Sequence, residues 1–294
     1  MPKMPQTCPL VGDADNYDKR GYLTEDFRLF HLKDTGVQEI SFHYHDFDKI
    51  ILFLSGDVTY LIEGRSYRLQ PWDIVLVNRN EIHRPVISPE EPYERMVIYL
   101  SPGFLSDYRT DAYDLSDCFR TARENHTHVL RMHRSARRSL TDSIERLEAS
   151  VADTGYAHPL YQRVLFLEFL IQLNRIAGSR KLDYPETPGS DSRILEVMDY
   201  IRDHLSEPLS IDSLACRFHF SRYHLMRLFK QETGYTLSRY ITNKRLLSAR
   251  ELLGTDIPLT DICYRCGFQN YSSFFRAYKA EFDEAPRAGR RHDR

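Results

Sequence analysis

The chain has 294 residues, of which 41% are hydrophobic and 28% charged, as in ordinary globular proteins. Its 13 Gly and 14 Pro are too few for a collagenous or low-complexity chain, and its five Cys do not form the pattern of a disulfide framework. No stretch resembles a membrane span, and the N-terminus lacks the apolar core of a signal peptide, so we expect a cytoplasmic protein.

Charge is unevenly divided along the chain. Residues 190–294 contain 17 Lys and Arg against 14 Asp and Glu, whereas residues 1–189 contain 23 against 28. Fourteen of the 17 basic residues are Arg, which forms paired hydrogen bonds with phosphate and guanine. This excess hints at a C-terminal part that faces nucleic acid, although many unrelated proteins show as much.

Short β-strands are predicted between residues 37 and 100. Segments rich in Val, Ile, Phe and Tyr alternate with Gly-bearing turns, which is typical of a sandwich or small barrel. Ile50–Leu54 is apolar throughout, as in a strand that is buried on both faces. The expected strands are Val37–Tyr44, Ile50–Leu54, Val58–Ile62, Tyr67–Leu69, Ile74–Val77, Pro85–Ile87 and Arg95–Leu100.

After about Pro102 the pattern changes to helix. Ser139–Val151 carries one apolar stripe, whereas Leu160–Ile176 is apolar on more than one side. Such a helix must be buried on both sides, by the β domain and a partner subunit or, alternatively, within the core of a monomer. The polar segment Gly178–Asp191 then links the two halves.

Helices are predicted from Ser192 up to an Arg-rich tail. Ser210 is an expected N-cap and Gly234 an expected C-cap. The predicted helices are Arg193–Leu205, Ile211–Arg217, Arg222–Thr233, Leu237–Leu253, Asp261–Cys266 and Tyr271–Phe282.

Two helix–turn–helix units in this half superpose. Residues of the first helix recur at an offset of 48 and residues of the second at an offset of 49, which places one extra residue in the second turn, next to Gly267. Ser221 and Asn270 are expected to cap the second helix of each unit. The matched residues are Leu214, Ala215, Leu225, Arg227, Phe229 and Lys230, and Ile262, Cys263, Phe274, Arg276, Tyr278 and Lys279.

With this spacing, residues 190–294 resemble the AraC/XylS family of bacterial transcription regulators. The family usually ends in Gly-x-x-Pro followed by Tyr-Arg, whereas here Asp283 replaces the Gly and the aromatic residue is missing. The resemblance rests on Ala215, Ser221, Leu225, Arg227, Phe229, Lys230 and Gly234, on Tyr240, Arg245, Leu246, Ala249, Leu252 and Leu253, and on Ile262, Gly267, Phe268, Ser272, Phe274 and Arg276.

The resemblance implies that the second helix of each unit contacts DNA. Arg, Asn and Gln recognise base edges, while Ser and backbone amides at a helix start more often hold phosphate. The alternative for any single position is a solvated or capping residue. The candidate DNA-binding residues are Ser221, Arg222, Tyr223, His224, Arg227, Gln269, Asn270, Tyr271, Ser272, Ser273 and Arg276.

The β segment contains Phe42-His43-Tyr44-His45 and, 38 residues later, His83. These residues resemble the two motifs of the cupin barrel, which forms the sensor domain of many AraC-type regulators. Metal-binding cupins have a Glu four residues after His-x-His, but Lys49 holds that position here and would repel an ion. Three His could still hold zinc with a water, yet no metal or other cofactor is expected.

We expect instead a site for a small organic effector, with carbohydrates among the candidates. Trp72 could stack on a sugar ring, or it could be a plug packed against Ile74–Val77. The candidate effector-binding residues are His43, His45, Lys49, Trp72, His83 and Arg84.

The remaining signals do not indicate catalysis. Cys263 and Cys266 form a C-x-x-C, but buried thiols fit this helical motif better than a redox pair. His126, His128 and His133 lack a partner cluster and are expected to be solvated. The sequence contains no Gly-rich phosphate loop and no Gly-x-Ser-x-Gly.

The sequence therefore predicts an α+β multidomain protein. We expect a cupin-like sensing domain over residues 1–110, a helical dimerisation segment over 111–177, a linker over 178–191 and a DNA-binding domain over 192–294. The expected function is a homodimeric, effector-responsive transcription activator with double-stranded DNA and RNA polymerase as partners, and not an enzyme. The alternatives are a metal-dependent cupin enzyme fused to a DNA-binding domain and a protein-interaction module.

Overall fold

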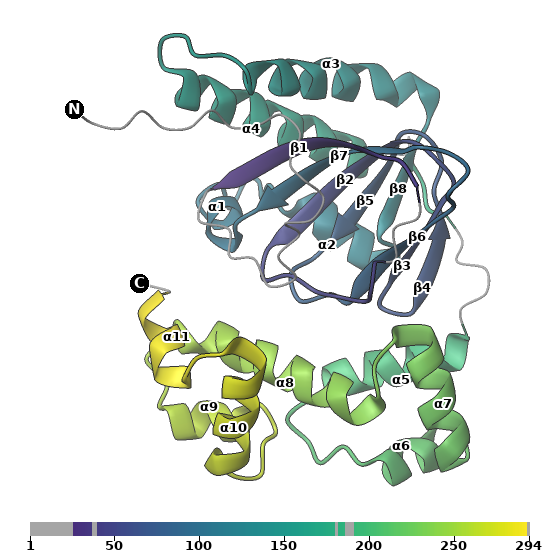
Figure 1. Cartoon of the computed structure of the whole chain (residues 1–294). Helices are drawn as coiled ribbons and strands as arrows, with labels where there is room; N and C mark the ends of the chain where they lie inside the picture. The colour runs from purple at the N-terminus through teal and green to yellow at the C-terminus, as the bar shows by residue number, and fades with distance from the viewer. Residues whose placement is uncertain (1–25, 37–39, 180–181, 186–190, 293–294) are drawn as a thin grey trace. The chain divides into compact units, whose positions relative to one another are not determined.

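The structure, a computed structural model, describes residues 26–36, 40–179, 182–185 and 191–292 (Figure 1). The chain divides into two compact units, a β-rich N-terminal one and a helical C-terminal one. None of the described helices has the length and hydropathy needed to cross a membrane. The predicted α+β organisation is confirmed.

The described residues of the N-terminal unit form two sheets. The larger has the strand order β1-β7-β2-β5-β8-β9 and the smaller the order β4-β3-β6. The strands are β1 (Phe27–Asp34), β2 (Asp48–Ser55), β3 (Val58–Ile62), β4 (Arg65–Arg68), β5 (Asp73–Val77), β6 (His83–Ile87), β7 (Tyr93–Leu100), β8 (Val129–Met132) and β9 (Leu182–Asp183).

Strand β2 is buried on both faces, as predicted. Ile50 belongs to the apolar core shared with the helices, whereas Ile51 and Phe53 belong to the core between the strands of the two sheets. Because successive side chains of a strand point to opposite faces, Lys49 shares the face of Ile51 and Phe53. The cationic side chain therefore lies on the barrel-interior face of the sheet.

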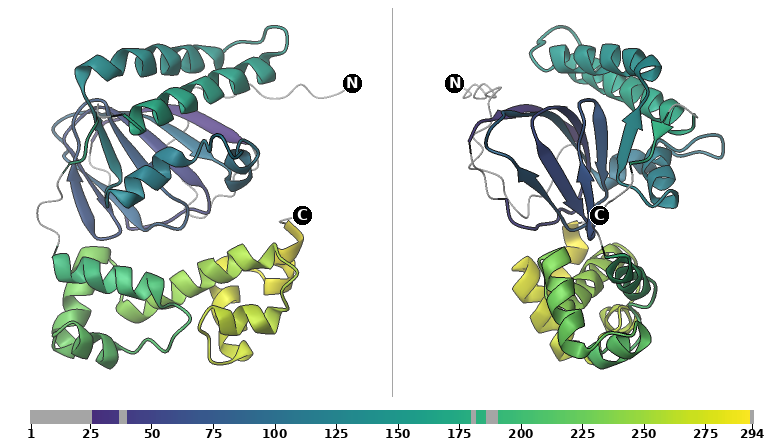
Figure 2. Two further views of the ribbon diagram at one scale, coloured as in Figure 1. Left: turned by 180° about the vertical axis from the view of Figure 1, so that it is seen from behind. Right: turned by 90° about the vertical axis from the view of Figure 1, so that its right-hand side faces the viewer.

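The described part of this unit also contains four helices: α1 (Pro102–Ser106), α2 (Asp117–Glu124), α3 (Arg134–Ser150) and α4 (His158–Ala177). Helices α3 and α4 lie side by side and cover the outer face of the larger sheet (Figure 2). The side chain of Asn174 on α4 accepts a hydrogen bond from the Cys118 amide at 2.7 Å and donates one to the Leu115 carbonyl at 2.9 Å. These bonds tie α2 to α4.

The prediction of a first strand over Val37–Tyr44 is wrong for the residues that the structure describes. Residues 40–44 form no strand, and His43 makes only an isolated bridge with His83; residues 37–39 lie outside the described part. The strand at this edge of the sheet is instead β1, which pairs with β7 along its whole length. Its half-exposed, mixed sequence carries little apolar periodicity, so pairing rather than local propensity defines it.

The C-terminal unit consists of helices joined by short turns. Four of the six predicted helices have the predicted bounds, and α11 was not predicted. The predicted caps are confirmed: Ser210 accepts from the Ser213 amide, and Gly234 ends its helix in the left-handed conformation. The helices are α5 (Ser192–Asp203), α6 (Ile211–Arg217), α7 (Arg222–Thr233), α8 (Leu237–Leu253), α9 (Leu259–Arg265), α10 (Tyr271–Phe282) and α11 (Pro286–His292).

The two thiols of the C-x-x-C are buried, as predicted. Cys263 and Cys266 belong to the core between α8, α9 and α10, and both are free. Burial raises the pKa of each thiol, which keeps both in the unreactive protonated form.

Candidate functional sites

The turns of the two helix–turn–helix units follow the same backbone path. His219 in the first turn and Gly267 in the second both have positive φ, 56° and 85°. In each turn the next amide closes back onto the first helix: Phe220 donates to Ala215 at 2.9 Å, and the equivalent Phe268 donates to Cys263 at 3.1 Å. The repeat read from the sequence is therefore a repeat of backbone hydrogen bonds.

The two paths separate after this closing bond. The first unit reaches its cap, Ser221, directly, whereas Gln269 intervenes before the cap Asn270 in the second. Ser221 accepts from the His224 amide at 3.3 Å and Asn270 from the Ser273 amide at 2.8 Å. The predicted capping roles are confirmed, and DNA contact by the same side chains stays a prediction.

The exposed face of α7 carries the candidates of the first unit. Leu225 and Phe229 are fully buried, whereas Tyr223 is 83% exposed. Arg222, His224 and Arg227 are exposed on the same helix. The helix therefore anchors itself with apolar residues and presents cationic and aromatic side chains to solvent.

The second unit presents a different set of side chains on α10. Gln269, Ser272 and Arg276 are exposed, whereas Tyr271 and Ser273 are half-buried. The Tyr271 ring lies 5.9 Å from that of the buried Phe274, so part of its surface packs within the unit. The most accessible candidates are polar and cationic.

One candidate, Arg222, is already engaged by a neighbouring helix. Its Nη1 lies 3.2 Å from both carboxylate oxygens of Asp212 on α6. Both side chains are more than half exposed, so the pair is accessible to a phosphate that could compete with Asp212. Sequence reasoning did not single out Asp212.

A junction around Arg245 joins the two helix–turn–helix units. From α8, its Nε donates to the Leu205 carbonyl at 2.9 Å and its Nη2 to the Glu207 carbonyl at 2.6 Å. Gly267 packs directly against Leu205 and the Arg245 guanidinium. The turn of the second unit is thus fixed against the segment that precedes the first.

In the N-terminal unit three histidines converge. His43, His45 and His83 are buried, and each offers a ring nitrogen within 4.8 Å of the other two. His43 and His83 exchange both backbone hydrogen bonds, at 3.1 and 2.9 Å, which places their rings 4.4 Å apart. The structure thereby brings together the two motifs that are 38 residues apart.

Backbone carbonyls fix the orientation of two of these rings. His43 donates from Nδ1 to the Ser41 carbonyl at 2.8 Å, and His83 donates from Nδ1 to the Glu81 carbonyl at 2.9 Å. In a neutral ring Nε2 is then the acceptor. Burial and the charge of Lys49 lower the pKa of His45 to about 2 and that of His83 well below its ordinary value, so both rings are neutral near pH 7.

The three imidazoles meet one requirement of a metal centre. Three neutral rings at this separation suit Zn²⁺ or a similar ion. Lys49 does not fit, because its ammonium acts electrostatically on His45 and His83 and would repel a cation. A positive charge stands where a ligand set would need a neutral or negative group, so we derive no metal chemistry here.

Two other effector candidates make different contacts. Trp72 packs against the apolar core between the larger sheet and the helices. This position agrees with the alternative in which Trp72 is a plug packed against Ile74–Val77. Lys49 lies on the opposite face of that sheet, which packs against the core between the two sheets. Arg84 follows His83 on β6, and its guanidinium lies 4.5 Å from the ring centroid of Phe42.

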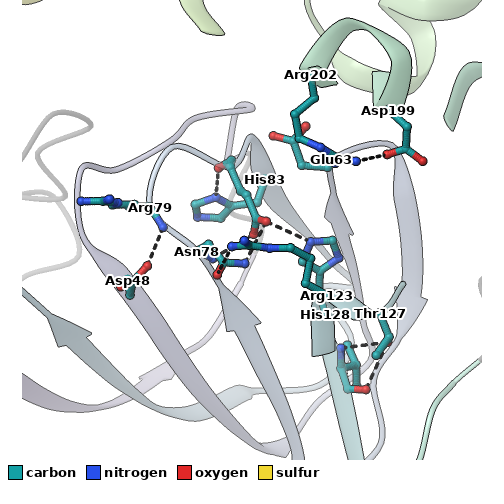
Figure 3. A network of polar contacts seen from close by, with 12 residues as sticks. Asp48, Glu63, Asn78, Arg79, His83, Arg123, Thr127, His128, Asp199 and Arg202 are labelled. Carbon is teal, nitrogen blue, oxygen red and sulfur yellow. Dashed lines mark hydrogen bonds and ion pairs between the residues drawn. The ribbon is translucent and has the colours of Figure 1, made fainter. Parts of the chain in front are cut away.

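A polar network behind His83 was not anticipated from the sequence (Figure 3). The Glu81 carboxylate accepts from the backbone and side-chain amides of Asn78 at 2.8 Å and lies 3.4 Å from Nε2 of His128. The side chain of Asn78 in turn accepts from Arg123 on α2 at 3.2 Å. The expectation that His128 is solvated is therefore wrong, because it is largely buried between Glu81 and the Tyr67 hydroxyl.

Family comparisons match both halves of the chain. The model of the AraC-like ligand binding domain matches residues 32–170, and that of a helix-turn-helix domain matches residues 214–292. Among curated proteins, the HTH-type transcriptional activator RhaS of Enterobacter sp. (strain 638) is 29% identical over 259 residues, which cover 83% of this chain and 85% of the relative. RhaS of Klebsiella pneumoniae (strain 342) is 25% identical over 257 residues, with the same coverage.

Solved structures give partial likenesses. ToxT from Vibrio cholerae is 16% identical with a TM-score of 0.35, over 90% of this chain and 98% of that one. A transcriptional regulator with an AraC-type DNA-binding domain from Chromobacterium violaceum is 35% identical with a TM-score of 0.34, over 36% of this chain and 95% of that one.

Proposed function

We propose that this chain, which belongs to the AraC family of transcription regulators, binds DNA as a homodimer. We further propose that it activates transcription in response to a small molecule held in its N-terminal barrel. The chain is a DNA-binding regulator and not an enzyme. Activation is proposed from the curated relatives, which are named transcriptional activators. Such a regulator contacts RNA polymerase and acts in the cytoplasm.

DNA recognition is proposed for the exposed faces of α7 and α10. The observation that carries this proposal is the repeated turn, which starts two helices with the same backbone geometry. Arg222 is exposed at the first position of α7, and Arg276 is exposed midway along α10. Arginine and amide side chains at the start of a recognition helix suit the major groove. The hydroxyls and capped helix starts suit phosphate.

Dimerisation is proposed for the outer face of α4. Leu160, Val164 and Ile171 are 62%, 53% and 40% exposed, and Leu167 lies between them in the sequence. These residues recur at spacings of four, three and four, the seam of a two-helix coiled coil. The opposite face of α4, with Phe166 and Phe169, is fully buried in the unit itself. A second copy would therefore cover the stripe that this unit leaves exposed.

The effector site is proposed at the histidine cluster with Lys49. The candidate residues that converge are His43, His45, Lys49 and His83. A few polar groups in an otherwise apolar barrel provide the chemical specificity of a small-molecule site.

In-vitro selection of bound DNA tests the DNA-binding part of this proposal. We expect each protomer to select two short motifs about 10 base pairs apart, because the two units enter successive major grooves. The double variant Arg222→Ala and Arg276→Ala should lose the preference for the selected site, whereas Arg138→Ala, an exposed arginine on α3, should not. Selection of no preferred sequence, with salt-insensitive binding, would favour a protein-interaction module instead.

A further inference from the structure

The ion pair between Arg222 and Asp212 lies at the start of the first proposed reading helix. Arg222 is the first residue of α7, and Asp212 lies in the first turn of α6. The Nη1 atom of Arg222 is 3.2 Å from both carboxylate oxygens of Asp212, and the two side chains are 55% and 69% exposed. The pair is therefore open to solvent at the end of α7 where DNA contact is proposed.

The packing of the helix–turn–helix unit fixes the backbone of both residues. Leu214, two positions after Asp212, and Leu225, three positions after Arg222, are buried in the unit. Only the long side chain of Arg222 is left to be oriented, and an arginine side chain has many rotamers. The carboxylate of Asp212 restricts that freedom, because it holds one end of the guanidinium.

This pairing leaves one edge of the guanidinium available. Among the described residues, Nη1 of Arg222 bonds only to Asp212, and the Nε and Nη2 atoms make no hydrogen bond. These two atoms carry parallel N–H groups along one edge of the planar guanidinium. Guanine presents two acceptors, O6 and N7, side by side in the major groove, and an arginine edge with two donors matches them.

The carboxylate also favours a base contact over a phosphate contact. Phosphate binding depends mainly on positive charge, but Asp212 compensates the charge of Arg222 and repels a phosphate placed beside it. The edge of a guanine carries no net charge and is recognised by geometry. Arg276 of the second unit differs, because its Nε donates to the Ser272 carbonyl of its own helix at 3.3 Å and none of the described carboxylates forms an ion pair with it.

We infer that Asp212 is a positioning residue that holds Arg222 for a bidentate contact with one guanine in the major groove. The pair thereby determines sequence specificity at one base pair and adds little to the affinity for DNA in general. The inference rests on the proposed DNA-binding function and deepens it, since it assigns a base to one residue and an orienting role to another.

In-vitro selection with variants of the full chain tests this assignment. The wild-type protein should prefer guanine at one defined position of the selected site. Arg222→Ala should reduce that preference about fivefold or more, the loss expected for a bidentate contact. Asp212→Asn should reduce it about two- to fivefold, the range of an exposed ion pair. In the Arg222→Ala background, Asp212→Asn should have no further effect at this position, because the carboxylate acts through the arginine.

Asp261→Asn is the matched control for the loss of charge. Asp261 is an exposed aspartate in the first turn of α9, the corresponding helix of the second unit, and none of the described cations forms an ion pair with it. Both aspartate variants remove one negative charge and should strengthen binding to unrelated DNA to a similar extent. Only Asp212→Asn should lose preference for the guanine. Thermal unfolding checks that each variant folds.

Salt dependence separates a base contact from a phosphate contact. Arg222→Ala should leave the slope of log affinity against log salt concentration unchanged, because no phosphate contact is lost. Loss of one phosphate contact would reduce that slope by about one.

Three results would overturn the assignment: Arg222→Ala weakens binding to all sequences equally or lowers the salt slope by about one, Asp212→Asn keeps the full guanine preference in a folded protein, or Asp261→Asn loses the same preference. In each case the wild-type protein still selects a sequence, so the DNA-binding function stands and the role of the pair is rejected. Failure of the wild-type protein to select any sequence would reject the function and this assignment together.

Discussion

A Cβ atom on Gly267 would overlap the carbonyl oxygen of Leu205, so the turn of the second helix–turn–helix unit packs at backbone contact against the segment before the first. The same carbonyl accepts a hydrogen bond from Arg245 on α8. The two units are therefore joined by more than the connecting helix, and the disposition of α7 and α10 depends on this contact.

Gly267→Ala should disturb both stability and DNA recognition. The φ of 85° alone disfavours alanine by about 1–2 kcal/mol, and the overlap with Leu205 adds to this cost. We expect a lower Tm for the C-terminal unit and at least tenfold weaker binding to the selected DNA. Gly36→Ala is the control, because Gly36 also has a positive φ, yet a Cβ there would meet no atom of the described residues within 4 Å. Wild-type DNA affinity in Gly267→Ala would show that the junction does not set the spacing of the units.

Asn270 permits a test that separates capping from DNA contact. Asn270→Ala should cost about 1 kcal/mol of stability, because the Ser273 amide loses its partner. Asn270→Asp keeps the cap but places a negative charge beside DNA, so we expect unchanged stability and at least tenfold weaker specific binding. Ser210→Ala, which removes the cap of α6, should lower stability without changing sequence preference. If Asn270→Asp binds DNA normally, Asn270 is a cap and nothing more.

Val164→Glu should dissociate the proposed dimer. The substitution places a charge in the middle of the exposed stripe on α4, where a second copy would have to bury it without a partner. Analytical ultracentrifugation should show at least a tenfold increase in the dimer dissociation constant. Ser139→Glu, an exposed position on α3, is the matched control. A dimer unaffected by Val164→Glu would place the interface elsewhere.

Acid should destabilise the N-terminal unit through its neutral histidines. Burial, reinforced by Lys49, lowers the pKa of His45 to about 2 and lowers that of His83, whereas both titrate near 6.5 in the unfolded chain. Below about pH 6.5 the unfolded state then binds more protons, so stability is complete above this pH and falls as the pH decreases. A ring that is protonated only in the unfolded chain lowers the stability by at most about 1.4 kcal/mol per pH unit.

Urea unfolding at pH 7.5 and 5.5 measures this dependence. Trp72 is the only tryptophan of the chain and lies in the N-terminal unit, so its fluorescence reports that unit alone. His45→Phe should remove about half of the pH dependence, whereas His126→Gln, an exposed position, should leave it unchanged. An undiminished dependence in His45→Phe would assign the acid sensitivity to other groups.

Local signals in the sequence predicted the C-terminal unit well, because its helices begin and end at residues with their own conformational preference. Ser210, Ser221 and Gly234 stop or start a helix through bonds within a few residues, and such bonds leave a mark in the sequence. The N-terminal unit was predicted less well. β1 exists because it pairs with β7, whose residues lie 59 to 73 positions further along the chain, and no local apolar pattern within Phe27–Asp34 marks that pairing.

The candidate effector site shows the same division. The His-x-His spacing and the distal His83 were visible as a motif, and the structure brings the three rings together. The roles of Glu81 and His128 depend on a contact between the segment before β6 and the segment before β8, so no local pattern revealed them. Trp72 was a candidate by residue type alone, and the turn before β5, in which Trp72 has a φ of 76° and donates its amide to the Phe53 carbonyl, decided its position.

The unlike starts of α7 and α10 have a consequence for promoters. α7 begins with Arg-Tyr-His and α10 with Tyr-Ser-Ser, so under the proposed function the two helices of one protomer present unlike chemistry to DNA. A DNA site read in this way has a polarity. Inverting one of the two motifs that a protomer contacts upstream of a gene, with its base composition unchanged, should therefore abolish binding of the protein to that DNA site.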